Sequence, residues 1–206
     1  MKNNNNYIFV LFSPGIGGNH LTNLLSISLK LCCNIITDKK NILEIYNNPI
    51  VHPDRKNLQK GEIKKILTNF KNEKDIILCG HIGEYLFLDT FYKNIKYKKF
   101  ITITGLNSSS IKKISPRINL LGDEYSQLVN VYYYNEQSTL YESKNIAKLL
   151  ESNNEKIIEV QLSNFLSANI IPLLNDIGTQ LGYTTLYDLD FCQELHTIWL
   201  ANNNIV

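Results

Sequence analysis

The sequence has few of the residues on which several protein classes depend. Four cysteines in 206 residues are too few for a disulfide-rich scaffold, and their spacing is not that of a zinc site. The formal net charge is only +2, which argues against a broad basic surface for nucleic acid. No apolar run approaches the length of a membrane span, and residues 1–6 are polar rather than signal-like. We therefore expect a cytoplasmic protein with no membrane span, no nucleic-acid partner and no bound metal.

The rest of the composition is that of an ordinary globular protein. Hydrophobic residues make up 44% of the chain and charged residues 19%. A chain of 206 residues is long enough to bury a sizeable core within one domain. We predict a single domain over residues 1–206, in which residues 1–6 are disordered and residues 184–206 form a C-terminal helical segment.

Apolar, β-favouring runs alternate along the chain with stretches of helical periodicity. Strands are predicted at residues 7–12, 75–79, 99–104 and 156–162, with a short one within 34–38. Helices are predicted after residue 18 and at residues 41–48, 60–70, 83–92, 143–152, 164–181 and 190–202, while 128–134 fits either type. This alternation predicts an α/β fold with three layers, α/β/α, around a mostly parallel sheet.

The first predicted strand ends in a glycine-rich turn. The apolar run 7–12 stops at Ser13-Pro14, and Gly15, Gly17 and Gly18 follow before the helical pattern begins. A strand, glycine loop and helix in this order direct several backbone N–H groups and a helix N-terminus at one point, which favours a phosphate or sulfate. A plain glycine turn between strand and helix is the alternative interpretation.

Two common nucleotide loops do not match this segment. The Walker pattern needs a lysine and then a hydroxyl after its last glycine, but Asn19 and His20 follow Gly18. The dinucleotide pattern G-x-G-x-x-G lacks its final glycine, because His20 stands there.

Polar residues also follow two other predicted strands. Gly80-His81 comes after the run 75–79, and Gly105 with Ser108–Ser110 comes after 99–104. Since ligands bind beyond the carboxyl ends of the strands in such sheets, we expect these strand ends and the glycine loop to form one anion-binding crevice.

The segment from Pro14 to Leu21 resembles the 5′-phosphosulfate loop of the sulfotransferases, P-[KR]-[SA]-G-[TS]-[TN]-x-L. Pro14, Gly17, Gly18, Asn19 and Leu21 occupy matching places. Later segments follow the family's order: ILCGHIGEYLFLDTF, KKFITITGLNSSS and KIIEVQLSNFLSANIIPLLNDIGTQLGY. The resemblance extends from residue 7 to about residue 183 and implies a P-loop NTPase-like, sulfotransferase-like fold.

The resemblance also implies an activity. Members of the family transfer a sulfuryl group from 3′-phosphoadenosine 5′-phosphosulfate (PAPS) to a hydroxyl or amine, here on a small-molecule or glycan acceptor. His81 matches the family's general base, a role that suits an imidazole. The implied donor-binding residues are Pro14, Gly15, Ile16, Gly17, Gly18, Asn19, His20, Leu21, Ser109 and Lys113.

The chain departs from the family pattern at Ile16, which replaces the customary small residue of the loop, and at three further positions. Gly15 replaces the basic residue of the loop, Gly105 replaces the arginine for the donor's 3′-phosphate, and Lys113 replaces a serine. Lys112, Lys113 and Arg117 either supply the missing charge or form a solvated basic face. Two further hypotheses therefore stay open: a catalytically degenerate protein that binds a nucleotide or a protein partner, and a P-loop kinase-like phosphotransferase.

The remaining histidines and the tryptophan allow more than one interpretation. His20 either contacts the anion or packs at the start of its helix. Trp199 and Leu195, four residues apart, predict a helix docked on the core, and His196 beside them faces either the crevice or the core. His52 belongs either to a lid on the acceptor side or to a surface loop.

Overall fold

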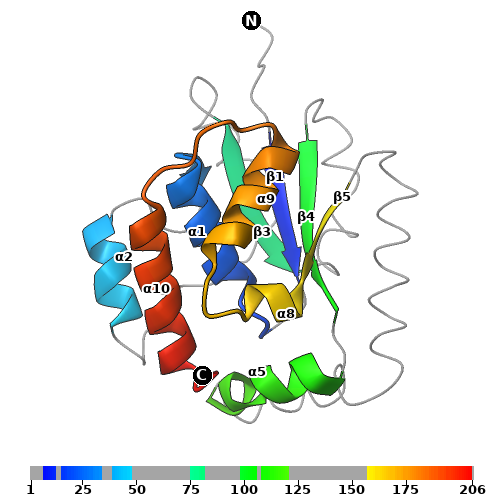
Figure 1. Cartoon of the computed structure of the whole chain (residues 1–206), viewed down its shortest axis with the longest axis vertical. Helices are drawn as coiled ribbons and strands as arrows, with labels where there is room; N and C mark the ends of the chain where they lie inside the picture. Colours follow the sequence, from blue (N-terminus) through cyan, green and yellow to red (C-terminus); the bar gives the residue numbers. More distant parts are fainter. Residues whose placement is uncertain are drawn as a thin grey trace, which may run out of the picture.

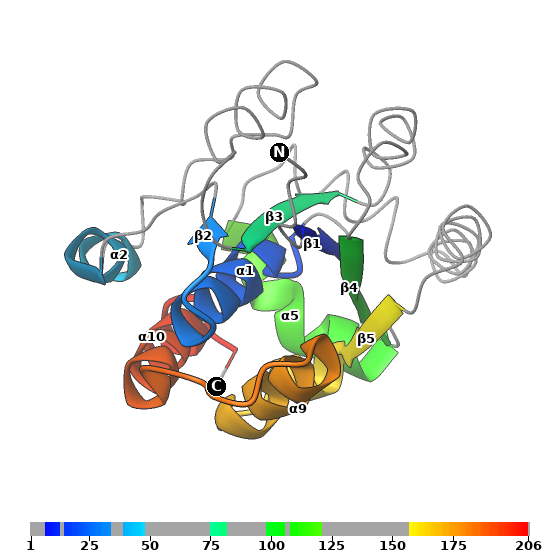
Figure 2. The same ribbon diagram turned by 90° about the horizontal axis from the view of Figure 1, so that it is seen from above.

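Five parallel strands form the centre of the molecule. The computed structural model describes residues 7–12, 15–33, 39–47, 75–81, 98–105, 108–120 and 157–205. The strands are β1 (Tyr7–Phe12), β2 (Cys32–Cys33), β3 (Ile76–His81), β4 (Lys98–Thr104) and β5 (Ile157–Gln161). They lie in the order β2-β3-β1-β4-β5, and every pair of neighbours is parallel (Figures 1 and 2).

Helices cover the sheet and extend past its end. On one face lie α1 (Gly18–Ser28), α9 (Ile171–Leu181) and α10 (Leu189–Asn202), with α2 (Lys39–Tyr46) beside α10 (Figure 2). Beyond the carboxyl ends of the strands lie α8 (Leu162–Phe165) and α5 (Ser108–Leu120) (Figure 1). This arrangement confirms the predicted α/β fold with a mostly parallel sheet.

The central position of β1 determines where the glycine loop lies. All six residues of β1 are buried, because β3 and β4 flank the strand and α1 packs against it. A continuous apolar run is typical of a parallel strand covered on both faces. The chain builds the sheet on the β3 side of β1 first and then crosses to the β4 side. The loop after β1 therefore lies at the switch point where α/β sheets bind ligands.

One prediction of secondary structure is wrong. The helix predicted at 164–181 is divided into α8 and α9, with residues 166–170 between them. Pro172 lies in the first turn of α9, where proline is tolerated because the N–H that it lacks would have no partner within the helix. The Asn169 side chain accepts a hydrogen bond from the Ile171 N–H at 3.1 Å. A short strand, β2, lies at Cys32–Cys33, directly before the segment 34–38 where the early short strand was predicted.

Other predictions fall on parts of the chain that are not described. The segments 1–6, 34–38, 60–70, 83–92, 128–134 and 143–152, and also His52, lie outside the described residues. Within the parts that are described, no helix is both long enough and apolar enough to span a bilayer.

Candidate functional site

The loop after β1 has the backbone conformation that an anion site needs. Gly15 and Gly17 have φ values of 85° and 89°, a region that favours glycine. α1 begins at Gly18, and its first backbone hydrogen bond runs from the Leu21 N–H to the Gly17 carbonyl at 3.1 Å. The N–H groups of a first helical turn have no partner within the helix, and with the helix dipole they attract an anion. Pro14 lies outside the described residues.

Packing behind the loop also requires two of its glycines. A Cβ on Gly17 would lie 2.5 Å from Cζ2 of Trp199 and 3.0 Å from a ring carbon of Phe165. A Cβ on Gly18 would overlap the ring of Phe12. Packing therefore requires glycine at these two positions, whether or not the loop binds a ligand.

The end of β3 lies beside the loop. His81 is the last residue of β3 and pairs in register with Phe12, the last residue of β1. Two residues earlier, the thiol of Cys79 donates to the amide oxygen of Asn19 at 3.3 Å. This bond occupies the Asn19 oxygen, so the amide nitrogen is the part of the side chain that can donate to an anion. The backbone thus brings His81 to the loop, whereas its side chain lies outside the described part of the chain.

Three residues predicted to bind the donor direct their side chains into the core. Ile16 and Leu21 are fully buried in the main hydrophobic cluster, so only their backbone groups can face a ligand. His20 is also buried, and its two ring nitrogens lie against the Tyr46 hydroxyl and His196 Nδ1. Its imidazole therefore faces the interior, which is the packed alternative of the sequence analysis.

The end of β4 has neutral polar groups where the sulfotransferases have an arginine. Gly105 has a φ of 78°, and the side-chain oxygen of Gln161 fills the space that a Cβ on this glycine would need. Gln161 donates to Thr104 Oγ1 at 3.1 Å, and Ser110 Oγ donates to the Gly105 carbonyl at 2.7 Å. No side chain larger than glycine fits at position 105 without displacing Gln161.

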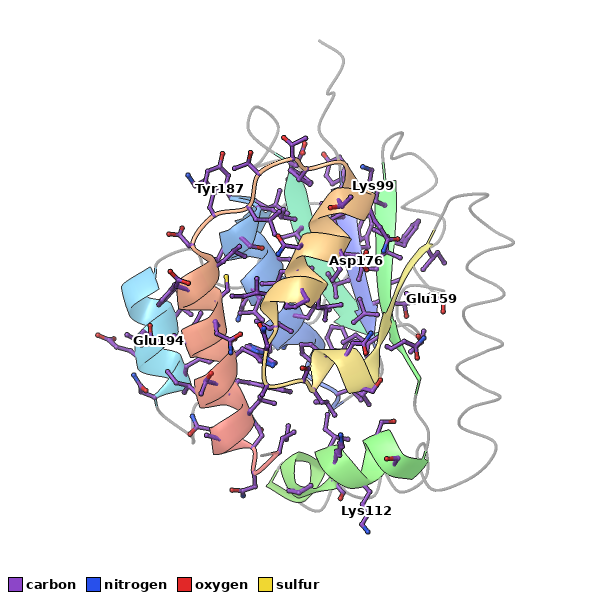
Figure 3. The ribbon with its side chains drawn as sticks, in the orientation of Figure 1. Lys99, Lys112, Glu159, Asp176, Tyr187 and Glu194 are labelled. Carbon is purple, nitrogen blue, oxygen red and sulfur yellow. The ribbon has the colours of Figure 1, made fainter. Side chains whose placement is uncertain are left out.

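The first turns of α5 present polar side chains beyond the strand ends. Ser109, Lys112 and Lys113 are exposed. The side chain of Lys112 points away from the sheet (Figure 3), so it does not supply charge to the crevice in this conformation. The donor-binding roles of Ser109 and Lys113 stay predictions, and the Arg117 side chain is not described.

Sequence reasoning missed that His20 and His196 are partners. Their facing nitrogens are 3.0 Å apart although 176 positions separate them in the chain. Burial lowers the pKa of His196, and the hydrogen bond to the Ser167 carbonyl opposes this effect in part. Helical periodicity placed His196 beside Leu195 and Trp199, the residues predicted to dock the helix. No signal in a single sequence indicates which residue His196 contacts. Trp199 docks α10 on the core, as predicted, with Phe165 and His20 as neighbours.

Within the described residues, no group of three or more histidine, cysteine, aspartate or glutamate side chains is arranged to hold a metal ion. The described arrangement is instead suited to a tetrahedral anion held by backbone N–H groups and the Asn19 amide.

Comparison with known proteins identifies the class of fold. A sulfotransferase from Alicyclobacillus acidocaldarius is similar with a TM-score of 0.51 and 12% identity, over 95% of this chain and 91% of that one. A sugar kinase from Janibacter sp. HTCC2649 is similar with a TM-score of 0.50 and 15% identity, over 87% of this chain and 96% of that one. No family model and no curated protein matches the sequence. The likeness at this identity shows the fold, which is the P-loop-like α/β fold that these two structures share.

Proposed function

We propose that this protein is a transferase that moves a sulfuryl group from PAPS to a hydroxyl or amine of a small-molecule or glycan acceptor. The observation that carries the proposal is the glycine loop at the carboxyl end of the central strand. Its backbone suits an anion, while the two positions that serve a Walker loop have other roles. The two positions after Gly18 hold Asn19, which accepts a hydrogen bond from Cys79, and His20, which is buried. Neither position therefore supplies the phosphate-binding lysine or the magnesium-binding hydroxyl of a Walker loop. A sulfuryl donor fits this loop better than a magnesium nucleoside triphosphate does.

Each residue of the proposed site has a distinct role. The backbone N–H groups of the first turn of α1 and the Asn19 amide would hold the 5′-phosphosulfate. His81, at the end of β3, would take the proton of the acceptor as the sulfur–oxygen bond to the donor breaks. Ser109 and Lys113, on α5, would contact the donor's 3′-phosphate, because position 105 has no side chain to do so.

A thermal-shift titration tests the donor assignment. The full chain is titrated with 3′-phosphoadenosine 5′-phosphate, with ATP and sulfate as controls. A ligand at a hundredfold excess over its dissociation constant adds about 2.7 kcal/mol to the free energy of unfolding, which raises the midpoint visibly. We expect a selective response to the bisphosphate. An equal or larger response to ATP would favour the phosphotransferase alternative, which the similarity to a sugar kinase supports, and no response to any nucleotide would contradict both.

Turnover of the His81→Ala variant tests the general base. Removal of a general base lowers turnover by about 10²–10⁴-fold. We expect such a loss with unchanged affinity for the bisphosphate, whereas unchanged turnover would remove His81 from the mechanism.

A further inference from the structure

Behind the glycine loop, a series of buried side chains is connected by hydrogen bonds. One carbonyl group determines the direction of these bonds. His196 Nε2 lies 2.8 Å from the Ser167 carbonyl oxygen, which only accepts, so this nitrogen carries a proton. His196 Nδ1 is then the acceptor of a neutral imidazole, and His20 Nε2 donates to it. By the same rule His20 Nδ1 accepts from the Tyr46 hydroxyl. Both imidazoles are therefore Nε2–H tautomers.

The far end of this series has an acceptor that is not used. Asn23 is fully buried, and its amide nitrogen is a distant 3.5 Å from the Tyr46 hydroxyl. Among the residues that the structure describes, its amide oxygen, also buried, has no hydrogen-bond partner. An unsatisfied buried oxygen is costly and calls for an explanation. A half-turn of the amide would place this oxygen against the Tyr46 hydroxyl, where it could accept a proton.

We propose that these side chains take up one proton from solvent by reversing the hydrogen bonds that join His196, His20, Tyr46 and Asn23, and that an anion on the glycine loop favours the protonated form. In that form His196 carries both ring protons and is the charged member. His20 becomes the neutral Nδ1–H tautomer, so that its Nε2 accepts from His196 and its Nδ1 donates to Tyr46. The Tyr46 hydroxyl then donates to the Asn23 oxygen. One proton is gained, and each imidazole N–H and the Tyr46 hydroxyl has an acceptor.

The residues around the His20–His196 pair leave burial as the main influence on its charge. The aromatic rings against it are those of Phe165 and Trp199, and the other titratable group on the buried face of α10 is the Cys192 thiol, which donates to the Leu24 carbonyl. The carboxylates of α10 itself, Asp190 and Glu194, are exposed, and so are Glu44 on α2 and Asp176 on α9. Burial therefore keeps the pKa of His196 below its ordinary value, so His196 is neutral near pH 7 when no ligand is bound.

The pair is packed against the wall of the loop. The His20 ring stacks on Trp199 with centroids 4.5 Å apart, and Trp199 fills the space beside Gly17. Protonation thus places a positive charge behind a loop in which Gly15 stands where the sulfotransferases have a basic residue. By linkage, a ligand whose affinity increases with this charge increases the affinity of the pair for the proton by the same factor. This half of the proposal rests on the proposed anion site.

Nitrogen NMR of the imidazoles tests the proton site directly in the full chain, which has only four histidines. As the pH falls, we expect His196 to become doubly protonated while His20 changes from the Nε2–H to the Nδ1–H tautomer without gaining a charge. The proposal is overturned if His20 keeps its Nε2–H tautomer when His196 is charged, or if His20 itself takes the charge.

Two matched variants isolate the Asn23 oxygen. Asn23→Leu keeps the volume but removes the acceptor, so the tautomer change of His20 should disappear. Thr102→Val removes the partnerless Oγ1 of another fully buried side chain, on β4, and should leave the change intact. If Asn23→Leu does not fold, Tyr46→Phe is used instead, because it removes the hydroxyl that connects His20 to the Asn23 oxygen. A tautomer change that persists in Asn23→Leu, or in its Tyr46→Phe replacement, would contradict the proposal.

Sulfate, which does not titrate in this range, tests the coupling. Its affinity is measured at about pH 8 and about pH 5.5, on either side of the ordinary histidine pKa. We expect sulfate affinity to increase on acidification by a factor at least about fivefold larger in the wild type than in Asn23→Leu. A factor of about five is the lower end of ordinary coupling factors. Equal gains overturn the coupling. Absence of sulfate binding at both pH values overturns the coupling together with the anion loop, whereas the tautomer titration judges the proton site separately.

Discussion

The inner and outer sides of the glycine loop differ in what determines their residues. On the inner side, Trp199 and Phe12 fill the space beside Gly17 and Gly18. On the outer side, Asn19 is only partly buried, and Ser109, Lys112 and Lys113 on α5 are exposed. Packing therefore accounts for the glycines of the inner side, while a ligand would account for the polar groups of the outer side. A glycine pattern alone does not distinguish these two causes.

The largest effect is expected when the inner side loses its tryptophan. Trp199→Ala removes a buried ring that contacts Phe165 and His20, and such truncations cost about 3–5 kcal/mol. Urea unfolding measures the change in the free energy of unfolding. A loss of less than about 1 kcal/mol would mean that α10 does not hold the loop.

Gly17→Ala should cost more than about 2 kcal/mol, because it combines a left-handed φ of 89° with a clash against Trp199. Gly182→Ala is the matched control, since its φ is 86° but nothing lies within 4 Å of the added Cβ. We expect the control to cost about 1 kcal/mol. In the Trp199→Ala background the cost of Gly17→Ala should fall to that of the control, and equal costs in both backgrounds would contradict the packing account.

Acid should weaken the inner side. Burial lowers the pKa of His196 below its unfolded value of about 6.5, so the unfolded chain binds more protons below that pH. Stability is then complete above about pH 6.5 and falls, by up to about 1.4 kcal/mol per pH unit, as the pH decreases toward the folded pKa. Urea unfolding at several pH values should show this slope and a smaller one in His196→Gln. Identical slopes would show that His196 does not titrate on unfolding.

The smallest effect on stability is expected on the outer side. Lys113→Ala should change the free energy of unfolding by less than about 0.5 kcal/mol, because the side chain is exposed. If Lys113 contacts the donor, its loss should weaken binding of 3′-phosphoadenosine 5′-phosphate by about tenfold or more. Calorimetry measures the affinity, and Lys112→Ala is the control because that side chain points away from the sheet (Figure 3). Equal effects of the two substitutions would place the donor elsewhere.

Local sequence patterns predicted much of the fold and less of the site. Periodicity and apolar runs located β1, α10 and the C-terminal end of α9 closely, because each element buries one continuous face or a whole strand. The break at residues 166–170 was missed, since Pro172 is compatible with the first turn of a helix as well as with a boundary. The link between His20 and His196 depends on tertiary packing, which a single sequence does not encode as a local pattern.

The central claim is that the outer side of the glycine loop binds the donor while the inner side is a packed wall. Backbone amide chemical shifts, recorded during titration with 3′-phosphoadenosine 5′-phosphate, test it most directly. The account predicts the largest changes at the N–H groups of Gly15, Gly18 and Asn19. Saturable binding with its largest changes at another end of the sheet, and none at these three amides, would contradict it.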